Sequence, residues 1–536
     1  MILYILSILF IFFLAYFTYG KFLEKSYKVE TSEEVPSKKF QDGVDFVPTN
    51  KFVLLGHHFS SIAGAGPIVG PILAGLSFGW LPALLWIVVG TIFIGGLHDF
   101  SSLIISIRHN GLSIAQIANK YINKTTYKVF LLFIWLALMY VVAVFTDLAA
   151  DSFAFTPSVA QINIFYIVIA IFFGILVYRL KLNIVVSTLL CLGLIFFGIL
   201  FSLQSAIFIA SKQTWVVVLL IYAAVASVLP VWFLLQPRDY LSSYFLYFTV
   251  IVGVAGLIFG KDEISYPLFI TFNSKTIGPL VPFMFITIAC GAISGFHSLV
   301  SSGTTSKQID NIKNARFVAY GGMILEGIVA AISVATVMIL SPQQQLTNPQ
   351  QIYALGIAKF VSIFGLNPEV GKIIGFLAIS AFILTTLDTA TRIARYIFQE
   401  LTEKLENKFF ERVFATVVSL ILPIILLFWQ IKDSCGRVIP CWKVVWPIFG
   451  STNQLLAALV LLIIYAWVKK EKIKLNLSVI LPVVFMLAMT LSALGYTLYL
   501  KISSLTFDVI TISSVLLFIL GIFIIYESFK ILKNKK

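Results

Sequence analysis

The stretch GHHFSSIAGAGPIVGP, residues 56–71, decides how the fold of this 536-residue chain is interpreted. It places three glycines and two prolines, from Gly64 to Pro71, inside a long apolar run. Proline has no N–H and leaves an upstream carbonyl without a helical partner. Such groups are costly in lipid, so an interrupted backbone survives there only inside protein or beside a cavity. Because secondary transporters bind substrates at helix breaks near the membrane midplane, the stretch predicts a binding site. Close helix packing through small residues is the alternative.

The composition predicts an all-α polytopic membrane protein. Hydrophobic residues make up 59% of the chain and charged residues 12%, with a mean hydropathy of +0.99. Soluble domains carry about 25% charged residues. Apolar runs of about 20 residues, each long enough to cross a bilayer, recur from end to end. The formal net charge of +14 comes from lysines and arginines between these runs, so nucleic acid is not expected as a partner.

We predict about fifteen transmembrane helices, at 2–20, 54–77, 80–107, 126–150, 162–178, 184–210, 215–236, 242–260, 278–303, 317–340, 372–396, 413–430, 446–468, 477–499 and 508–528. Most lysines and arginines then fall on one side, which the positive-inside rule assigns to the cytoplasm. The protein is expected in the cell inner membrane. Its N-terminus is expected outside and its C-terminus in the cytoplasm. The expected divisions are a leading helix (1–20), a cytoplasmic linker (21–53), a transporter core (54–396) and C-terminal helices (397–536).

A second interruption is predicted in ASVLPVWFLLQPRDYL, residues 226–241. After the leading helix, the two interrupted spans are the first and the sixth, and they run in opposite directions. This is the pattern of an inverted repeat of five helices, with the substrate between the breaks. The candidate substrate-binding residues are His57, His58, Ser60, Ser61, Gly64, Ala65, Gly66, Ser227, Pro230, Trp232 and Gln236.

The span at 278–303 supplies candidates for ion coupling. Ser294, His297 and Ser298 are spaced i, i+3, i+4, so they share a helix face. Ionisable groups inside membranes are costly and mark ion pathways or proton relays, and imidazole titrates near pH 6.5. The other coupling candidates are Ser301, Ser302, His98 and Asp99. The alternatives are serines bonded to their own helix carbonyls and a neutral core histidine.

Two further expectations concern side-chain pairs. Asp388 and Arg392, at i and i+4, are predicted to form a structural ion pair near the inner face. Cys435 and Cys441 flank GRVIP in a hairpin placed outside, where a disulfide and two free thiols are both open. Glu326 and Asp147 receive no role.

The chain resembles the carbon starvation protein A family of inner-membrane proteins. The resemblance is carried, in order, by VPTNKFVLLGHHFSSIAGAGPIVGPILA, GGLHDF, PVWFLLQPRDYL, GAISGFHSLVSSGTTSKQ, TTLDTATRIARYIFQE and WPIFGSTNQLLAAL. It implies uptake of peptides or pyruvate under carbon limitation, driven by protons, and kinship with transporters of the leucine-transporter type of inverted repeat.

The sequence therefore predicts a secondary transporter rather than an enzyme. Its partners would be a small-molecule substrate (a peptide or carboxylate), membrane lipid and a coupling cation, with H⁺ favoured over Na⁺. No G-x-x-x-x-G-K-[ST] motif indicates ATP as the energy source, and no cofactor or metal is expected. The alternatives are a sodium-coupled transporter, an intramembrane metalloprotein and a starvation sensor.

Overall fold

The structure is a computed structural model that describes residues 1–30, 33–204, 207–341, 348–365, 367–402, 408–432, 438–504 and 509–534. It is built from α-helices, with two short antiparallel hairpins, β1 (Asn273–Ser274) with β2 (Gly278–Pro279) and β3 (Gln430–Lys432) with β4 (Val438–Pro440). The helices of the first half are α1 (Ile2–Phe17), α2 (Tyr19–Ser26), α3 (Pro36–Lys39), α4 (Lys51–Ala63), α5 (Gly66–Phe78), α6 (Trp80–Val89), α7 (Gly96–Arg108), α8 (Ile114–Tyr121), α9 (Lys124–Phe155), α10 (Pro157–Gly174), α11 (Ile184–Gln204), α12 (Lys212–Val228) and α13 (Leu235–Phe259). Those of the second half are α14 (Leu280–Thr287), α15 (Gly295–Gly303), α16 (Gly321–Met338), α17 (Pro349–Ser362), α18 (Pro368–Leu401), α19 (Lys408–Phe428), α20 (Cys441–Lys470), α21 (Asn476–Ser503) and α22 (Val509–Asn534).

Within the described residues, twelve helices are long and apolar enough to cross a membrane, and the bent pair α4–α5 makes a thirteenth if it is one span. The predicted count of fifteen is therefore not confirmed. The two remaining predicted spans correspond to α12, which has 17 residues, and to the short helices α14 and α15.

The helix at residues 51–78 is broken where its glycines and prolines predict. α4 begins at Asn50, whose side chain accepts a hydrogen bond from the Phe52 amide and so caps the helix. It ends at Gly64, whose φ of +47° lies in the left-handed region, where glycine is favoured. α5 then begins with Pro67 in its first turn, and the two halves are bent by 40°.

The second broken helix lies elsewhere than predicted. Residues 229–234 form a turn between α12 and α13, so the interruption expected in residues 226–241 separates two helices. Pro237 sits in the first turn of α13, where a missing N–H leaves no intrahelical bond unmade. The broken helix is instead the pair α14 and α15, with non-helical backbone from Ile288 to Ser294.

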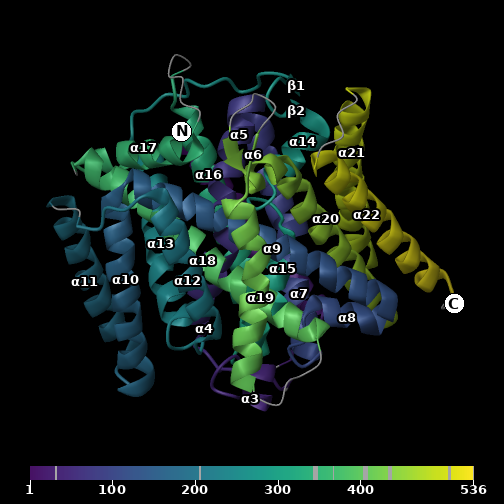
Figure 1. Cartoon of the computed structure of the whole chain (residues 1–536). Coiled ribbons are helices and arrows are strands. Elements are labelled where there is room, and N and C mark those ends of the chain that lie inside the picture. The colour runs from purple at the N-terminus through teal and green to yellow at the C-terminus, as the bar shows by residue number, and fades with distance from the viewer. Residues whose placement is uncertain are drawn as a thin grey trace.

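The chain contains two halves with the same order of elements. Each half has a broken helix (α4–α5, α14–α15), then a helix with a π-helical segment (Gly90–Gly95 before α7, Arg316–Tyr320 before α16), then a short peripheral helix (α8, α17), a long helix (α9, α18) and two more helices (α12 and α13, α19 and α20). The halves are inverted, because α4 and α8 lie at the bottom of Figure 1 whereas α14 and α17 lie at the top. α10 and α11 interrupt the first half, α1 precedes it, and α21 and α22 follow the second. The five-helix repeat is present, with its second break at α14–α15.

Candidate substrate and coupling site

A cavity of about 800 Å³ lies between the two helix breaks. Ala65 and Gly66 line it from the first break, and Thr287, Ala289 and Cys290 line it from the second. This volume falls within the roughly 300–1,000 Å³ of small-molecule sites. The lining residues come from α5, α9, α14, the start of α17, α18 and α20, so both halves of the repeat build the cavity.

Two glycines allow the breaks to approach their neighbours. A Cβ on Gly66 would lie 2.0 Å from the Cβ of Cys290, and a Cβ on Gly64 would lie 2.9 Å from the Oγ1 of Thr386. Real Cβ atoms essentially never come closer than 3.0 Å to a neighbouring heavy atom. The two broken helices therefore touch through Gly66 and Cys290 at the inner end of the cavity.

The other end of the cavity reaches α17 and the β1–β2 hairpin. Asn348 and Gln351, at the start of α17, and Thr276, in the hairpin, belong to its wall. Both elements lie at the top of Figure 1, at the end that carries the N-terminus. The start of helix α17 therefore borders this end of the cavity.

Toward the opposite end, the first of two buried networks joins α4 to α13 and α18. His57 donates from Nδ1 to the Asp239 carboxylate at 2.6 Å. Arg238 binds Asp239 at 2.7 Å and also pairs with Asp388. Tyr222 donates its hydroxyl to Asp388 at 2.8 Å. The side chains of His57, Asp239 and Arg238 have 0% exposure, so the charges are removed from solvent and lipid and compensate one another.

The second network joins α4 to α7 and α15. His58 contacts Asp99 through Nε2 at 2.7 Å, and its Nδ1 contacts the Thr305 hydroxyl at 2.9 Å. Ser301 donates to the other oxygen of Asp99. The same helix α4 therefore carries adjacent imidazoles that face two different carboxylates.

His297 faces a carboxylate that has no role in the sequence-based prediction. Its Nε2 lies 3.4 Å from Oε2 of Glu326, and both side chains have 0% exposure. Neither imidazole nitrogen and neither Glu326 oxygen makes a hydrogen bond to a described residue. The charged or titratable groups around His297 are Asp99 and His98 of α7 and His58 of α4, besides Glu326 of α16. Cys290, which lies in the non-helical segment before α15, lines the cavity.

The hydroxyl candidates divide into two groups. Ser298 and Ser302 donate to the carbonyls of Gly295 and Ser298 in their own helix, which is the structural alternative. Ser294 lies before α15 and is its N-cap, so the shared face predicted for Ser294, His297 and Ser298 is wrong. Ser301 bonds Asp99.

Several candidate substrate residues lie outside the cavity. Of those proposed on residues 56–71, Ala65 and Gly66 line it, whereas His57, His58, Ser60, Ser61 and Gly64 do not. Ser60 donates to the Asp239 carbonyl, and Ser61 contacts the Thr389 hydroxyl. Both serines join helices behind the cavity.

The candidates around the expected second break also lie away from Gly66, because that segment is a turn between helices. Ser227 contacts Thr416 of α19. The guanidinium carbon of Arg179 lies over the Trp232 ring, 5.4 Å from its centroid. Gln236 donates to Thr49 and Gln308 near the start of α4. None of these three residues, nor Pro230, lines the cavity.

The predicted ion pair between Asp388 and Arg392 is wrong. Asp388 pairs with Arg238, whereas Arg392 binds Asp45 at 3.0 Å and donates to the carbonyls of Ala226 and Leu229 at the end of α12. A guanidinium is favoured there, because the last carbonyls of a helix lack partners and carry partial negative charge. His98 has no hydrogen-bond partner among the described residues.

The described residues bear on the expected disulfide and on the metal-binding alternative. The disulfide between Cys435 and Cys441 involves Cys435, which lies outside them, and Cys441 is a free thiol within them. The described residues contain no group of three or more His, Cys, Asp or Glu side chains arranged to hold a metal ion.

Sequence reasoning missed Glu326, Arg238 and Cys290 as parts of the site. Glu326 is an isolated acid in an apolar span, and such a residue in a membrane indicates a functional partner. Arg238 and Asp239 fall between the predicted spans at 215–236 and 242–260, whereas in the structure they belong to the first turns of α13. Cys290 carries no signal in the sequence, and only the fold brings it against Gly66.

Comparisons with known proteins agree with this architecture. The sequence matches the family described as carbon starvation protein CstA over residues 1–347 and 343–493. It is 31% identical to a peptide transporter CstA of Campylobacter jejuni, over 90% of this chain and 78% of that protein. It is also 31% identical to a pyruvate/proton symporter of Escherichia coli, over 91% of this chain and 80% of that protein.

A manganese transporter mutant of Eremococcus coleocola has a similar fold. Its crystal structure aligns with a TM-score of 0.52 at 11% sequence identity, covering 92% of this chain and 98% of that one. At this identity the likeness concerns the fold alone, and the fold is that of a membrane transporter. The family match and the 31% identity to a peptide transporter CstA establish that the chain belongs to the carbon starvation protein CstA family.

Proposed function

We propose that the protein imports a small carboxylate or a peptide, driven by protons, and binds it in the cavity between the two helix breaks. The observation that carries the proposal is the arrangement around the second break: Cys290 of this break lines the cavity, and His297, in the helix that follows the break, faces Glu326 with both side chains fully buried. The relatives named as a peptide transporter and as a pyruvate/proton symporter support the class of substrate and the ion.

The cavity suits a substrate with one anionic end and an apolar body. α5 begins at Gly66, which lines the cavity, so the positive end of its helix dipole lies at the cavity wall. A carboxylate is favoured at such a position. Aromatic side chains of α9, α18 and α20, namely Phe145, Phe376 and Phe449, form apolar walls for the rest of the substrate.

The charge of the His297–Glu326 pair couples proton binding to substrate binding. With one shared proton the pair is neutral overall or a compensated ion pair, whereas without it the pair carries one negative charge. An isolated charge of this kind is costly in a site of low dielectric, and it repels a substrate carboxylate nearby. Loss of the proton therefore weakens substrate binding and favours release.

We infer the orientation of the protein in the membrane from its charge distribution. Basic residues gather at the end opposite the N-terminus, which the positive-inside rule assigns to the cytoplasm. The cavity reaches the other end, at α17 and β1–β2. With the inferred orientation this end faces outward, which supports an outward-facing state. The networks of His57 and His58 close the inward end.

The test uses purified protein in proteoliposomes with labelled pyruvate and labelled dipeptides. His297→Gln and Glu326→Gln should retain substrate counterflow but lose accumulation driven by a pH gradient. Glu369→Gln is the matched control, since its side chain is 69% exposed and pairs only with Lys372, one turn on in the same helix, among the described residues. Persistence of gradient-driven accumulation at the wild-type level in both variants, or wild-type uptake that needs Na⁺ and ignores pH, contradicts the proposal.

A further inference from the structure

A second cavity of about 800 Å³ lies where several membrane spans end, opposite the substrate cavity. The spans Ile2–Ser26, Trp80–Arg108 and Ile448–Lys470 all terminate at its wall. Helix α8 and the connection after α20 complete it. Its depth is therefore that of the membrane–water interface, on the side that the charge distribution assigns to the cytoplasm.

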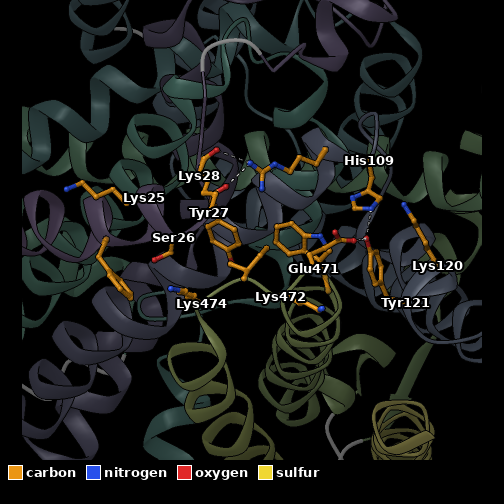
Figure 2. A pocket seen from close by; sticks show the side chains of 14 residues that line it. Lys25, Ser26, Tyr27, Lys28, His109, Lys120, Tyr121, Glu471, Lys472 and Lys474 are labelled. Atoms are coloured by element: carbon orange, nitrogen blue, oxygen red, sulfur yellow. Dashed lines mark hydrogen bonds between the residues drawn. The ribbon is translucent and has the colours of Figure 1, made fainter. Parts of the chain in front are cut away.

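The wall of this cavity is strongly basic, as Figure 2 shows. Its lysines are Lys25, Lys28, Lys120, Lys472 and Lys474, and none of them forms a salt bridge with another described residue. Arg108 is already neutralised by Glu33 at 2.8 Å. Glu471 is the one acidic lining residue that the structure describes, and it accepts a hydrogen bond from Tyr121. The five lysines thus leave a large positive charge without a carboxylate partner among the described residues.

The backbone supplies a second, independent observation. Lys28 and Lys472 have φ values of +48° and +53°, and they are two of four non-glycine residues with positive φ in the described chain. Each follows the C-cap residue of a helix (Tyr27 for α2, Glu471 for α20), and the amide of the next residue closes back onto the helix, from Val29 to Glu24 and from Ile473 to Val468. Glycine is the usual residue at this position of such a helix end. Both helices place lysine there instead, and both lysines line the cavity.

The floor of the cavity is apolar and aromatic. Tyr27 and Trp467 stack with ring centroids 5.3 Å apart, and Phe22 and Ile473 lie beside them. Tryptophan and tyrosine are enriched at the level of lipid headgroups. A site with ammonium groups at the rim and apolar side chains below matches a molecule with a phosphate head and a hydrocarbon body.

We propose that this cavity binds the headgroup of an anionic phospholipid from the cytoplasmic leaflet. The lysines contact the phosphate, and Phe22 and Ile473 contact the upper part of the acyl chains. Basic pockets between transmembrane helices on this side of a membrane are suited to such headgroups. The proposal depends on the inferred orientation but not on the identity of the transported substrate.

The test measures binding of phosphatidylglycerol to the full-length protein by native mass spectrometry, with phosphatidylcholine as the zwitterionic reference. Lys25→Gln/Lys28→Gln/Lys472→Gln/Lys474→Gln should lower the bound fraction of phosphatidylglycerol at least fivefold. The matched control removes four lysines from the same side but outside the cavity, Lys38→Gln/Lys128→Gln/Lys181→Gln/Lys313→Gln, and should change it less than twofold. Equal loss in both variants, or equal binding of both lipids, overturns the proposal.

Two further arms separate the remaining explanations. An excess of inorganic phosphate should leave phosphatidylglycerol bound, and displacement by phosphate shows a site for small soluble anions instead. Lys28→Gly/Lys472→Gly should keep or raise the thermal midpoint while lowering lipid binding, because glycine suits the left-handed backbone. Full lipid binding by this folded variant contradicts the role of the two lysines.

Discussion

The contact between the two broken helices predicts that one added methyl group at Gly66 impairs transport. In Gly66→Ala the new Cβ would lie 2.0 Å from the Cβ and 2.6 Å from the Sγ of Cys290. Ordinary carbon contacts are about 3.5–4.0 Å, so the breaks must separate by about 1.5 Å. Overpacking of this kind costs about 1–3 kcal/mol, which corresponds to an approximately 5–150-fold change in an equilibrium. Uptake and the thermal midpoint should both fall.

Substitutions of Cys290 test whether the approach of its Cβ to the new methyl group causes the loss of uptake. Cys290→Gly removes the Cβ that the new methyl group meets, so Gly66→Ala/Cys290→Gly should recover most of the lost uptake. Cys290→Ala keeps that Cβ and should restore little. Gly193→Ala is the control, because a Cβ at Gly193 would meet nothing within 4 Å. Labelled-substrate uptake in proteoliposomes, together with thermal unfolding of each purified variant, gives the comparison.

Two results would refute this account. Wild-type uptake by Gly66→Ala would show that the breaks do not meet through these residues during transport. Equal rescue by Cys290→Gly and Cys290→Ala would show that the sulfur, rather than the close approach of the Cβ atoms, is the obstacle.

Two predictions concern buried charges. Burial opposes ionisation of Asp45, but Arg395 and two neighbouring cations outweigh this and hold the pKa of Asp45 well below its usual range. Asp45→Asn should therefore lower the thermal midpoint by an amount that is constant above about pH 5 and shrinks as the pH falls through the usual aspartate pKa of about 3.9 and below; a pH-independent difference would contradict it. Arg238→Met should destabilise by about 3–5 kcal/mol by leaving a carboxylate buried without its partner, and Arg238→Met/Asp388→Leu should destabilise less, as measured by chemical unfolding. A double variant as unstable as the sum of its singles would exclude the pairing of Arg238 with Asp388.

The helix breaks show which parts of the fold could be predicted from the sequence. The break between Gly64 and Pro71 could be predicted, because two prolines within an apolar run remove helical hydrogen bonds whatever the surroundings. The break from Ile288 to Ser294 contains no proline, and its backbone is set by tertiary contacts such as Asn453 with Ser294. Proline at residues 230 and 237 marked a turn between two helices, because a proline pattern does not distinguish a break within a span from a connection at its end.

Only those residues of the candidate site that carry a local signal could be predicted from the sequence. His297 could be identified from its cost in an apolar span, and Ala65 and Gly66 from the break itself. The partners of these residues lie far along the chain, as with His58 and Asp99 or His297 and Glu326. Without the inverted repeat placed correctly, no spacing rule brings such residues together.

The positions of the three His–carboxylate contacts bear on how the proposed transport cycle would proceed. Two of them hold α4, one through Asp239 of α13 and the other through Asp99 of α7, and the third joins α15 to α16 through Glu326. α4 and α15 are the half-helices on the inward side of the two breaks. Any inward opening that moves these half-helices away from their neighbours must separate buried groups that compensate each other. Separation is least costly when the groups involved are neutral, so the protonation state of these contacts and the opening of the inward path are physically linked.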